Sequence, residues 1–535
     1  MSPPRQTLWG VAGMISVYLA AVVWVLLHRT DSNDGLVTVR IAHWQVEVGP
    51  SRGFAAVIKR FEALNLGIRV EQLIVPPGVY RQWLRANLAG EIAPEIVEYG
   101  VWLDGLSDVP VKYFEPLTHY LEQPNPYNEG TPLESLPWLE TFTDELSEQR
   151  LNSPEPGQYF AITLTRGSLR LFCNRDLLRE ITGSDHIPET MIEFRKLCEK
   201  VGAFGATRER PLMPLAGSGF NARFLLGIYL AGATSKLRTE LDRDGLLSLT
   251  SWRVLSSYQD KKWDFQRPEM KSALQLLAEL QEQMRPGYLQ LGRDEAAREF
   301  LRGDALFIFS GTWDATSLRK EAQFPISVGR CPQLTIDDPI VGPNVLGRIA
   351  DGNNVTGFGL SLTKSGKHRR EAVLFMQFLA SYEGNKIFSE VSGWPPSVNE
   401  VPMQPEIAEL LSPDDGFNNG TGFLNAGGST RALLERNLHL LAGFDGGVER
   451  LAAALDEQMP GAVRADLQAT ARDAWLSAVP QDARIAALSL LIAGAADADS
   501  LELRRERLEA AQNQSEARGM LIDMQLQASR TKDFK

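Results

Sequence analysis

Residues 37–77 read VTVRIAHWQVEVGPSRGFAAVIKRFEALNLGIRVEQLIVPP, and this stretch decides the fold class. Its two ends, at 37–42 and 68–75, are rich in β-branched residues and predict strands. Between them, apolar residues recur at helical spacing, and Gly67 follows as a helix stop. The apolar residues of this predicted helix are Phe54, Val57, Ile58, Phe61 and Leu64. The stretch therefore predicts a strand, a helix and a strand joined by short connections.

The same alternation continues outward to residue 99. A second helix, with Tyr80 and Leu84 on its apolar face, precedes a third strand at 95–99. Strands that alternate with helices predict an α/β fold with a doubly wound, mostly parallel sheet. Ligands bind such sheets beyond the carboxyl ends of the strands. Here those ends are His43–Trp44 and residues 99–102.

Further along the chain the pattern predicts a second α/β series. Strands are expected at 159–163, 169–173 and 305–309, with periodic helices between and after them. Residues 121–158 are rich in Pro, Glu, Asn and Gly. That composition predicts a long surface excursion and not a packed unit.

The last hundred residues predict helix only. From residue 431 onward, breaks are expected at the glycine turn of 445–447 and at Pro460 and Pro480. Residues 500–535 carry charges of mixed sign, which predict a solvated helix or a frayed tail.

The length and composition of the chain limit the classes of protein to which it can belong. The chain has 535 residues, enough for two large lobes plus extensions, and its 44% hydrophobic and 23% charged content is globular. Its net charge of −12 argues against nucleic-acid binding, because such binding needs a basic surface. The three cysteines, Cys173, Cys198 and Cys331, lack metal-ligand spacing and allow at most one disulfide. We interpret them as small buried hydrophobes.

Residues 8–27, LWGVAGMISVYLAAVVWVLL, form an uncharged apolar run near the start of the chain. As a helix this run would be about 30 Å long, enough to cross the core of a bilayer. It ends in His28-Arg29-Thr30-Asp31, without the small-residue site of a cleavable signal. We therefore favour an uncleaved signal anchor over a cleaved signal peptide, with a buried soluble helix as the third reading. The large remainder is expected outside the cytoplasmic membrane, in the periplasm or at the extracellular face.

Several segments carry patterns of a known family, in the family's order. EFLRGDALFIFSGTWDA at 299–315 matches F-x-x-G-k-a-A-M-x-x-x-G-x-W, and LRANLAGEIAPEIVEYG at 84–100 matches aaGtaPDvv with Glu95 for the usual Asp. IPETMIEFRKLCEKV at 187–201 matches a P-x-T-W-x-E helix with Met191 in the Trp place, and SGWPPSV at 392–398 matches a late G-x-x-P turn. Together they resemble the bacterial extracellular solute-binding proteins of the family 1 type, the maltose-binding-like substrate-binding proteins of ABC transporters.

The resemblance covers roughly residues 36–475 and implies a two-lobed periplasmic-binding-protein fold, type II-like, with the ligand cleft between the lobes. Lobe 1 would hold residues 36–160 and 355–400, and lobe 2 would hold 165–350 and 401–475. Residues 1–35 would be the signal anchor or signal peptide with a spacer. Residues 476–535 would be a helical C-terminal extension, for which the family has no counterpart.

Candidate ligand contacts follow the predicted strands or lie in turns that approach the cleft. A sugar offers flat C–H faces and hydroxyl groups, so its site needs aromatic plates together with carboxylates. The candidates are Trp44, Glu98, Trp102, Trp313, Asp314 and Trp394. The resemblance implies that the Trp of G-x-W, here Trp313, is often a sugar-stacking residue. The loop at 217–223 could also bring polar groups to the cleft, or could simply enter a helix.

Each candidate also has a structural interpretation. The tryptophans could be core residues, because Trp is first a large hydrophobe. Glu98 could only cap or pair locally, and Asp314 could cap the helix that follows it.

The predicted function is capture of a small polar ligand, with carbohydrate as the favoured class, for the permease subunits of an ABC importer. The alternatives are a receptor that presents its ligand to a membrane sensor and a scaffold that binds no ligand. Nucleophile-elbow, Walker A and H-E-x-x-H motifs are missing from the sequence, so neither catalysis nor a metal or cofactor is predicted. Polyols, sugar phosphates, polyamines and metal ions remain open as ligands.

Overall fold

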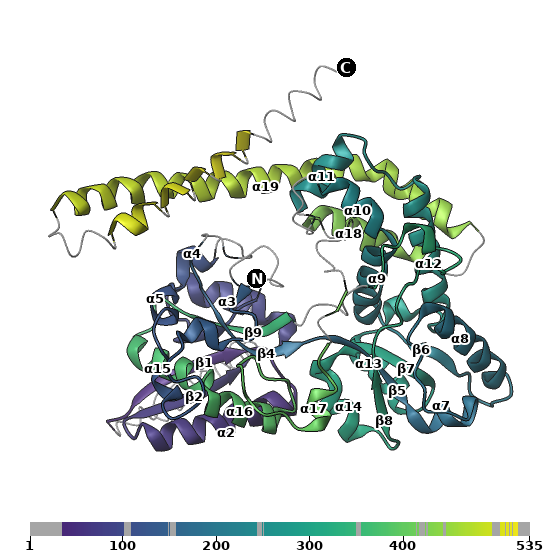
Figure 1. Ribbon diagram of the computed structural model, residues 1–535, viewed down its shortest axis with the longest axis horizontal. Coiled ribbons are helices and arrows are strands. Elements are labelled where there is room, and N and C mark those ends of the chain that lie inside the picture. The colour runs from purple at the N-terminus through teal and green to yellow at the C-terminus, as the bar shows by residue number, and fades with distance from the viewer. Residues whose placement is uncertain are drawn as a thin grey trace, which may run out of the picture.

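The computed structural model describes residues 35–100, 109–147, 157–242, 251–348, 355–412, 426–441 and 446–494, a few isolated residues, and most of 503–522. Two lobes lie side by side, and a long helix near the C-terminus passes above both of them (Figure 1). Within the described ranges, no helix has both the length and the apolar character that a membrane crossing requires. The predicted anchor at 8–27 lies outside these ranges.

Lobe 1 is built on a five-stranded sheet in the order β2-β1-β3-β9-β4. Its strands are β1 (Val37–His43), β2 (Ile68–Ile74), β3 (Ile96–Glu98), β4 (Ile162–Gly167) and β9 (Val355–Leu362). β1 pairs in parallel with β2 and β3, as predicted, whereas β9 runs antiparallel to β3 and β4. β9 is therefore the exception to the parallel arrangement, since it is the strand by which the chain returns after building the second sheet.

Helices α2 (Val48–Leu64), α3 (Pro77–Ala89), α15 (Arg369–Leu379) and α16 (Tyr382–Ser392) belong to lobe 1. The predicted apolar face of α2 is confirmed for Phe54, Val57, Ile58 and Phe61, which are buried in the lobe-1 core. It is wrong for Leu64, the last residue of the helix, which is 45% exposed. α16 packs closely along α2, where Gly53 leaves room for the Phe388 ring. This packing fixes the start of α2, which follows the carboxyl end of β1.

Lobe 2 is built on a four-stranded sheet in the order β6-β7-β5-β8. Its strands are β5 (Leu169–Asn174), β6 (Met213–Ala216), β7 (Ala305–Gly311) and β8 (Ile326–Gly329). The helices used below are α8 (Met191–Gly205), α9 (Gly219–Ala233), α11 (Ser251–Gln259), α12 (Pro268–Glu282), α13 (Arg293–Leu301) and α14 (Ala315–Glu321). Thr190 and Glu193 form a capping box at the start of α8, which explains the polar residues of that motif. All three cysteines are buried and free, which confirms their interpretation as hydrophobes.

The prediction of a surface excursion is wrong for residues 121–147. Trp138 and Phe142 are buried in the lobe-1 core, and the Trp138 indole N–H donates to the Ala380 carbonyl at 3.2 Å. The Asn125 amide likewise donates to the Gln377 carbonyl at 2.8 Å. A segment rich in turns can be packed when its polar groups find partners, and here the partners come from around α15.

The C-terminal region contains α18 (Gly428–Asn437) and α19 (Gly447–Gly494), a single helix of 48 residues. The predicted breaks at Pro460 and Pro480 are wrong, because α19 continues through both. Each proline removes one backbone hydrogen bond, and packing offsets that loss where Met459 and Val463 flank Pro460 as buried residues. The described residues of 503–522 are helical, as predicted.

Candidate ligand-binding site

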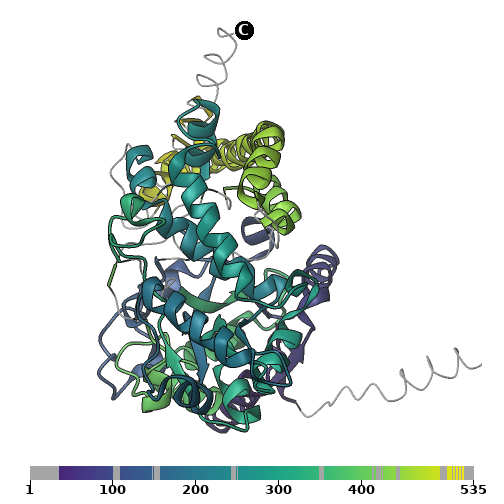
Figure 2. The ribbon, with the colours of Figure 1, turned by 90° about the vertical axis from the view of Figure 1, so that its right-hand side faces the viewer.

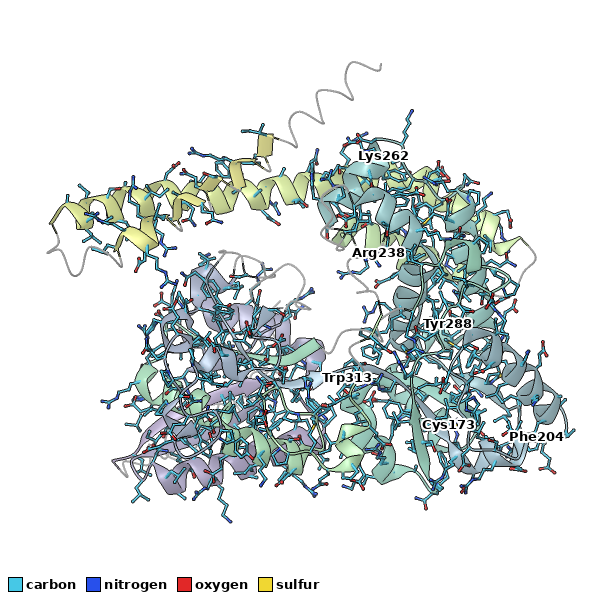
Figure 3. The ribbon with its side chains drawn as sticks, in the orientation of Figure 1. Cys173, Phe204, Arg238, Lys262, Tyr288 and Trp313 are labelled. Atoms are coloured by element: carbon cyan, nitrogen blue, oxygen red, sulfur yellow. The ribbon has the colours of Figure 1, made fainter. Side chains whose placement is uncertain are left out.

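Trp313 lies between the two lobes (Figure 3). It belongs to a 3-10 turn, Thr312–Asp314, directly after β7. Its ring folds back over Gly311, where a Cβ atom would lie 2.2 Å from the indole. The G-x-W spacing thus has a steric cause, because only glycine lets the ring lie so close to the backbone. Trp313 packs against the lobe-1 core cluster, and its centroid is 6.1 Å from that of Phe224 in α9 of lobe 2.

Asp314, next to Trp313, is held by an ionic network and does not act as a side-chain cap. It precedes α14, yet its carboxylate makes no capping hydrogen bond to that helix. Instead it accepts from the Ser310 hydroxyl and from the Arg293 guanidinium, whose Nε lies 3.2 Å from Oδ2. A terminal nitrogen of Arg293 also donates to Glu47 at 3.0 Å. Because Glu47 precedes α2 of lobe 1, this network joins the two lobes.

The position of Arg293 is unfavourable for a cation on its own. Arg293 is the first residue of α13, and a helix N-terminus repels positive charge. Burial lowers the pKa of Arg293, but the Asp314 and Glu47 carboxylates outweigh burial and hold that pKa above its ordinary value. Phe220 of α9 adds its ring, 5.7 Å from the guanidinium carbon. The cluster therefore places two carboxylates, one shared guanidinium and an aromatic face at the junction of the lobes.

Phe220 and Phe224 extend this aromatic surface on lobe 2. Their centroids are 5.1 Å apart, and the Arg223 guanidinium lies 5.8 and 5.7 Å from the two rings. Arg223 also pairs with Glu435 of α18 at 3.5 Å. The loop at 217–223 enters α9, with Ser218 as the cap that accepts from the Asn221 amide. It is thus both a helix start and a source of side chains near Trp313.

On lobe 1, Trp44 follows β1 and is partly buried. Its ring meets Tyr80 of α3 edge-on, with centroids 5.0 Å apart. Its amide donates to Glu98 Oε2 at 2.9 Å, and the Gln45 side chain donates to Glu98 Oε1 at 2.6 Å. The Tyr80 hydroxyl donates to the backbone carbonyl of Glu98 at 2.7 Å. Trp44 is therefore held at the end of the strand by contacts to its backbone and to its ring.

Glu98 itself is fully buried at the carboxyl end of β3. Burial raises the pKa of its carboxyl group well above the ordinary value, and the bonds from Trp44 and Gln45 oppose this only in part. His43, at the end of β1, is also fully buried, stacks on Phe54 and lies 2.7 Å from the Gln72 amide nitrogen. Burial lowers the pKa of His43 to about 4. In both groups burial disfavours the charged form, which raises the pKa of the carboxyl group of Glu98 and lowers that of the imidazole of His43.

Trp394 and Trp102 are placed differently from the other candidates. Trp394 is 5% exposed and lies in the lobe-1 core, 6.2 Å from the Phe358 ring. Its indole nitrogen is buried and has no hydrogen-bond partner among the described residues. Trp102 lies outside the described residues.

The structure brings Trp313 and Asp314 together at the junction of the lobes, and Trp44 beside Glu98 on lobe 1. Sequence reasoning missed Glu47 and Arg293, which link the lobes. A signal for Glu47 existed, since it lies three residues after Trp44 in the same strand-to-helix connection. Arg293 gave no such signal, because its partner Glu47 is 246 residues away.

A hollow of about 430 Å³ between α18 and α19 is separate from this site. It is lined by Ser429, Ala432, Leu433, Arg436, Gln458 and Ala462. Arg436 and Gln458 bond to each other across it at 2.9 Å, so we do not assign it a ligand. The described residues contain no group of three or more His, Cys, Asp or Glu side chains arranged to hold a metal ion.

Comparison with solved structures identifies the fold. The chain is similar to apo RafE from Streptococcus pneumoniae, with 17% identity, a TM-score of 0.53, and 79% of this chain and 98% of that chain covered. It is similar to the GacH receptor of Streptomyces glaucescens, with 15% identity, a TM-score of 0.56, and coverage of 80% and 99%. It is also similar to the MalE domain from Bdellovibrio bacteriovorus, with 16% identity, a TM-score of 0.53, and coverage of 79% and 100%.

The comparison by sequence gives a match to a protein family but none to an individual curated protein. Curated proteins give no match by sequence. The sequence profile of the bacterial extracellular solute-binding proteins matches residues 56–411, which include both sheets except for β1. The matched range contains Trp313, Asp314 and Arg293, and it ends before α18 and α19. The chain therefore belongs to the bacterial extracellular solute-binding protein family.

Proposed function

We propose that this protein captures a small carbohydrate between its two lobes, outside the cytoplasmic membrane, and delivers it to the permease of an ABC importer. The observation that carries the proposal is the group at the lobe junction, in which Trp313 adjoins Asp314, Arg293 and Glu47. Aromatic faces stack on the C–H faces of sugars, and charged side chains bind their hydroxyl groups through strong hydrogen bonds. Binding in a hinged cleft needs no catalytic group, and we propose none.

The similar structures support the carbohydrate class. One of them is RafE in complex with raffinose, and the MalE domain is bound to maltotriose. These are ligands of those proteins, at identities of 17% and 16%, so the similarity supports a class of ligand and no single sugar.

Among the candidate contacts, we propose that Trp313, Asp314 and Trp44 touch the ligand. All three are partly exposed, whereas Glu98 and Trp394 are buried in this conformer. Glu98, Trp394 and Trp102 stay predictions as ligand contacts. Glu98 supports the proposal indirectly, because it holds the backbone of Trp44 and the side chain of Gln45.

We propose that residues 8–27 anchor the receptor in the cytoplasmic membrane. The uncharged run of 20 residues supports this proposal, as does membership of an extracellular family. Alkaline carbonate extraction of membranes tests it, since an anchored chain stays in the pellet and a processed chain is released. The anchor would also suit a receptor that presents its ligand to a membrane sensor, and loss of sugar uptake on deletion of the gene would favour transport.

A thermal-shift screen of residues 36–535 against sugars, polyols and polyamines tests the binding function. A ligand that binds only the folded state stabilises it by about 2.7 kcal/mol at a hundredfold excess over its Kd. We expect a shift with one class of sugar that Trp313→Ala abolishes. Trp475→Ala, at an exposed tryptophan of α19, is the matched control and should leave the shift intact. No shift with any sugar would contradict the proposal.

A further inference from the structure

The first half of α19 is fixed to lobe 2. Leu451, Leu455 and Met459 are fully buried in the lobe-2 core, where α19 packs on α11, α12 and α18. Asp456 accepts from the Phe265 amide at 3.0 Å, and Asp466 accepts from two amides at the start of α18 at 2.8 Å each. This half of the helix therefore moves with lobe 2.

The second half of α19 forms a two-helix arm with the described helical residues of 503–522. Small side chains of α19, including Ala474 and Ala478, are buried, and so is Ala510 of the last helix. Asp482 accepts from Arg518 at 3.0 Å, and Arg507 donates to the Ser489 hydroxyl at 2.8 Å. Two helices bonded along their length resist bending, so the arm extends the rigid body of lobe 2.

This arm reaches lobe 1. Figure 1 shows α19 crossing from above α11 and α18 of lobe 2 to above α4 (Val109–Tyr113) of lobe 1. Figure 2, turned by a right angle, shows the same helix nearly end-on in the upper part of the molecule. Near the tip of the arm, the Arg505 guanidinium donates to Glu122 at 2.8 Å. Glu122 directly follows α5 (Thr118–Leu121) of lobe 1, so this contact joins the two lobes at a point away from the Arg293–Glu47 contact.

The length of the arm makes this second contact sensitive to the angle between the lobes. Residues 470–494 of α19 correspond to about 40 Å of helix. A hinge rotation of roughly 10° moves a point that lies about 40 Å from the hinge axis by about 7 Å, whereas an ion pair needs its atoms within about 4 Å. The Arg505–Glu122 contact can therefore form over only a narrow range of interlobe angles.

We propose that α19 (Gly447–Gly494), together with the described helical residues of 503–522, is a strap that sets the interlobe angle of the ligand-free protein. The strap is rigid with lobe 2 and is fastened to lobe 1 through Arg505 and Glu122. If the proposed function holds, any hinge rotation that accompanies ligand binding has to release this fastening. Both residues are exposed, so the fastening biases the angle and does not lock it. An exposed ion pair changes such a population ratio by less than about fivefold.

Distances between spin labels on the two lobes test the strap without any ligand. Lys59→Cys in α2 and Lys196→Cys in α8 are exposed labelling sites, and the native cysteines are buried. Pulsed electron–electron double resonance on the ligand-free full chain should give a narrow distribution of distances between the two spin labels. Arg505→Glu, which sets two carboxylates against each other, should widen the distribution, and the reversal pair Glu122→Arg with Arg505→Glu should narrow it again. Because no ligand is used, failure here is distinguishable from failure of the receptor function.

Arg504→Glu is the matched control. It makes the same change of charge on the neighbouring exposed residue, and it should leave the distribution unchanged. Circular dichroism should show equal helix content in all variants. A distribution that Arg505→Glu does not alter would overturn the proposal. A widening that the charge reversal does not correct would also overturn it, because the effect would then not pass through this pair.

Discussion

Arg293 of lobe 2 donates to Glu47 of lobe 1 at 3.0 Å, and the same guanidinium binds Asp314 beside Trp313. One cation thus holds together two carboxylates that come from different lobes. Both carboxylates are only 15% exposed, so water screens them poorly. The candidate ligand site and the contact between the lobes consequently share side chains.

Arg293→Gln should lower the free energy of unfolding by about 1–3 kcal/mol, because it removes charged hydrogen bonds and leaves two carboxylates facing each other. Denaturant titration followed by circular dichroism measures this change. Arg298→Gln is the control, since Arg298 pairs with Glu295 on the exposed face of the same helix. That substitution should cost less than about 0.5 kcal/mol. Equal losses in the two variants would mean that the cross-lobe network contributes no more than a surface pair.

Gly311→Ala should displace the Trp313 ring. The added Cβ would lie 2.2 Å from the indole, and the expected loss of stability is about 1–3 kcal/mol from overpacking. If Trp313 stacks on the ligand, the thermal shift of the cognate sugar should fall as well. Gly227→Ala in the middle of α9 is the control, where an added Cβ meets nothing within 4 Å. It should stabilise the helix by about 0.5–1 kcal/mol. An unaltered ligand shift in Gly311→Ala would argue that Trp313 packs without touching ligand.

Trp138→Ala should destabilise the protein by about 3–5 kcal/mol, because a fully buried ring would be replaced by a cavity. This prediction tests the finding that residues 121–147 are part of the lobe-1 core. Trp475→Ala provides the comparison at a tryptophan that is 55% exposed, where we expect a change within about 0.5 kcal/mol. Thermal unfolding of both variants decides the point, and a small effect at Trp138 would restore the idea of a surface excursion.

The local elements of the fold were predictable because their signals are local. The strands at 37–42, 68–75 and 305–309 correspond to β1, β2 and β7, since runs of apolar β-branched or aromatic residues between turn signals mark buried strands. The packing of Trp138 was not predictable, because its partner carbonyl at Ala380 is 242 residues away. The continuity of α19 through Pro460 and Pro480 also depends on packing, which a local rule for proline does not include.

At the candidate site, too, only the features with a local sequence signal were predictable. The G-x-W pattern located Trp313, and the end of the first strand located Trp44. For Asp314 the local pattern predicts a ligand contact or a helix cap, and it gives no sign of the partner Arg293, which lies 21 residues earlier in the chain. The ionic link between the lobes needs the folded topology, because it joins the starts of α2 and α13.

Glu98→Gln should change how stability depends on pH. Burial raises the pKa of Glu98 in the folded protein above its unfolded value, so the folded state holds a proton that the unfolded state releases. The contribution of Glu98 to stability is therefore fully present below the unfolded pKa and is lost as the pH rises through the folded pKa. His43 has the opposite effect, because its folded pKa of about 4 lies below its unfolded pKa and its contribution to stability is lost as the pH falls between the two values. His43 is present in both the wild type and the Glu98→Gln variant, so its effect cancels in the comparison. The difference between wild type and variant consequently isolates Glu98.

Glutamine keeps the shape of the protonated side chain, and its amide can pair with Gln45 if the Gln45 amide turns over. Denaturant titrations at a series of pH values should therefore find the variant gaining stability relative to wild type as the pH rises above about 5. Gln45→Glu is the opposing variant, because it adds a second carboxyl group beside Glu98 and should steepen the loss of stability with rising pH. A wild type and a Glu98→Gln variant with parallel pH profiles would mean that Glu98 is charged in the folded protein, with Trp44 and Gln45 stabilising it as a carboxylate.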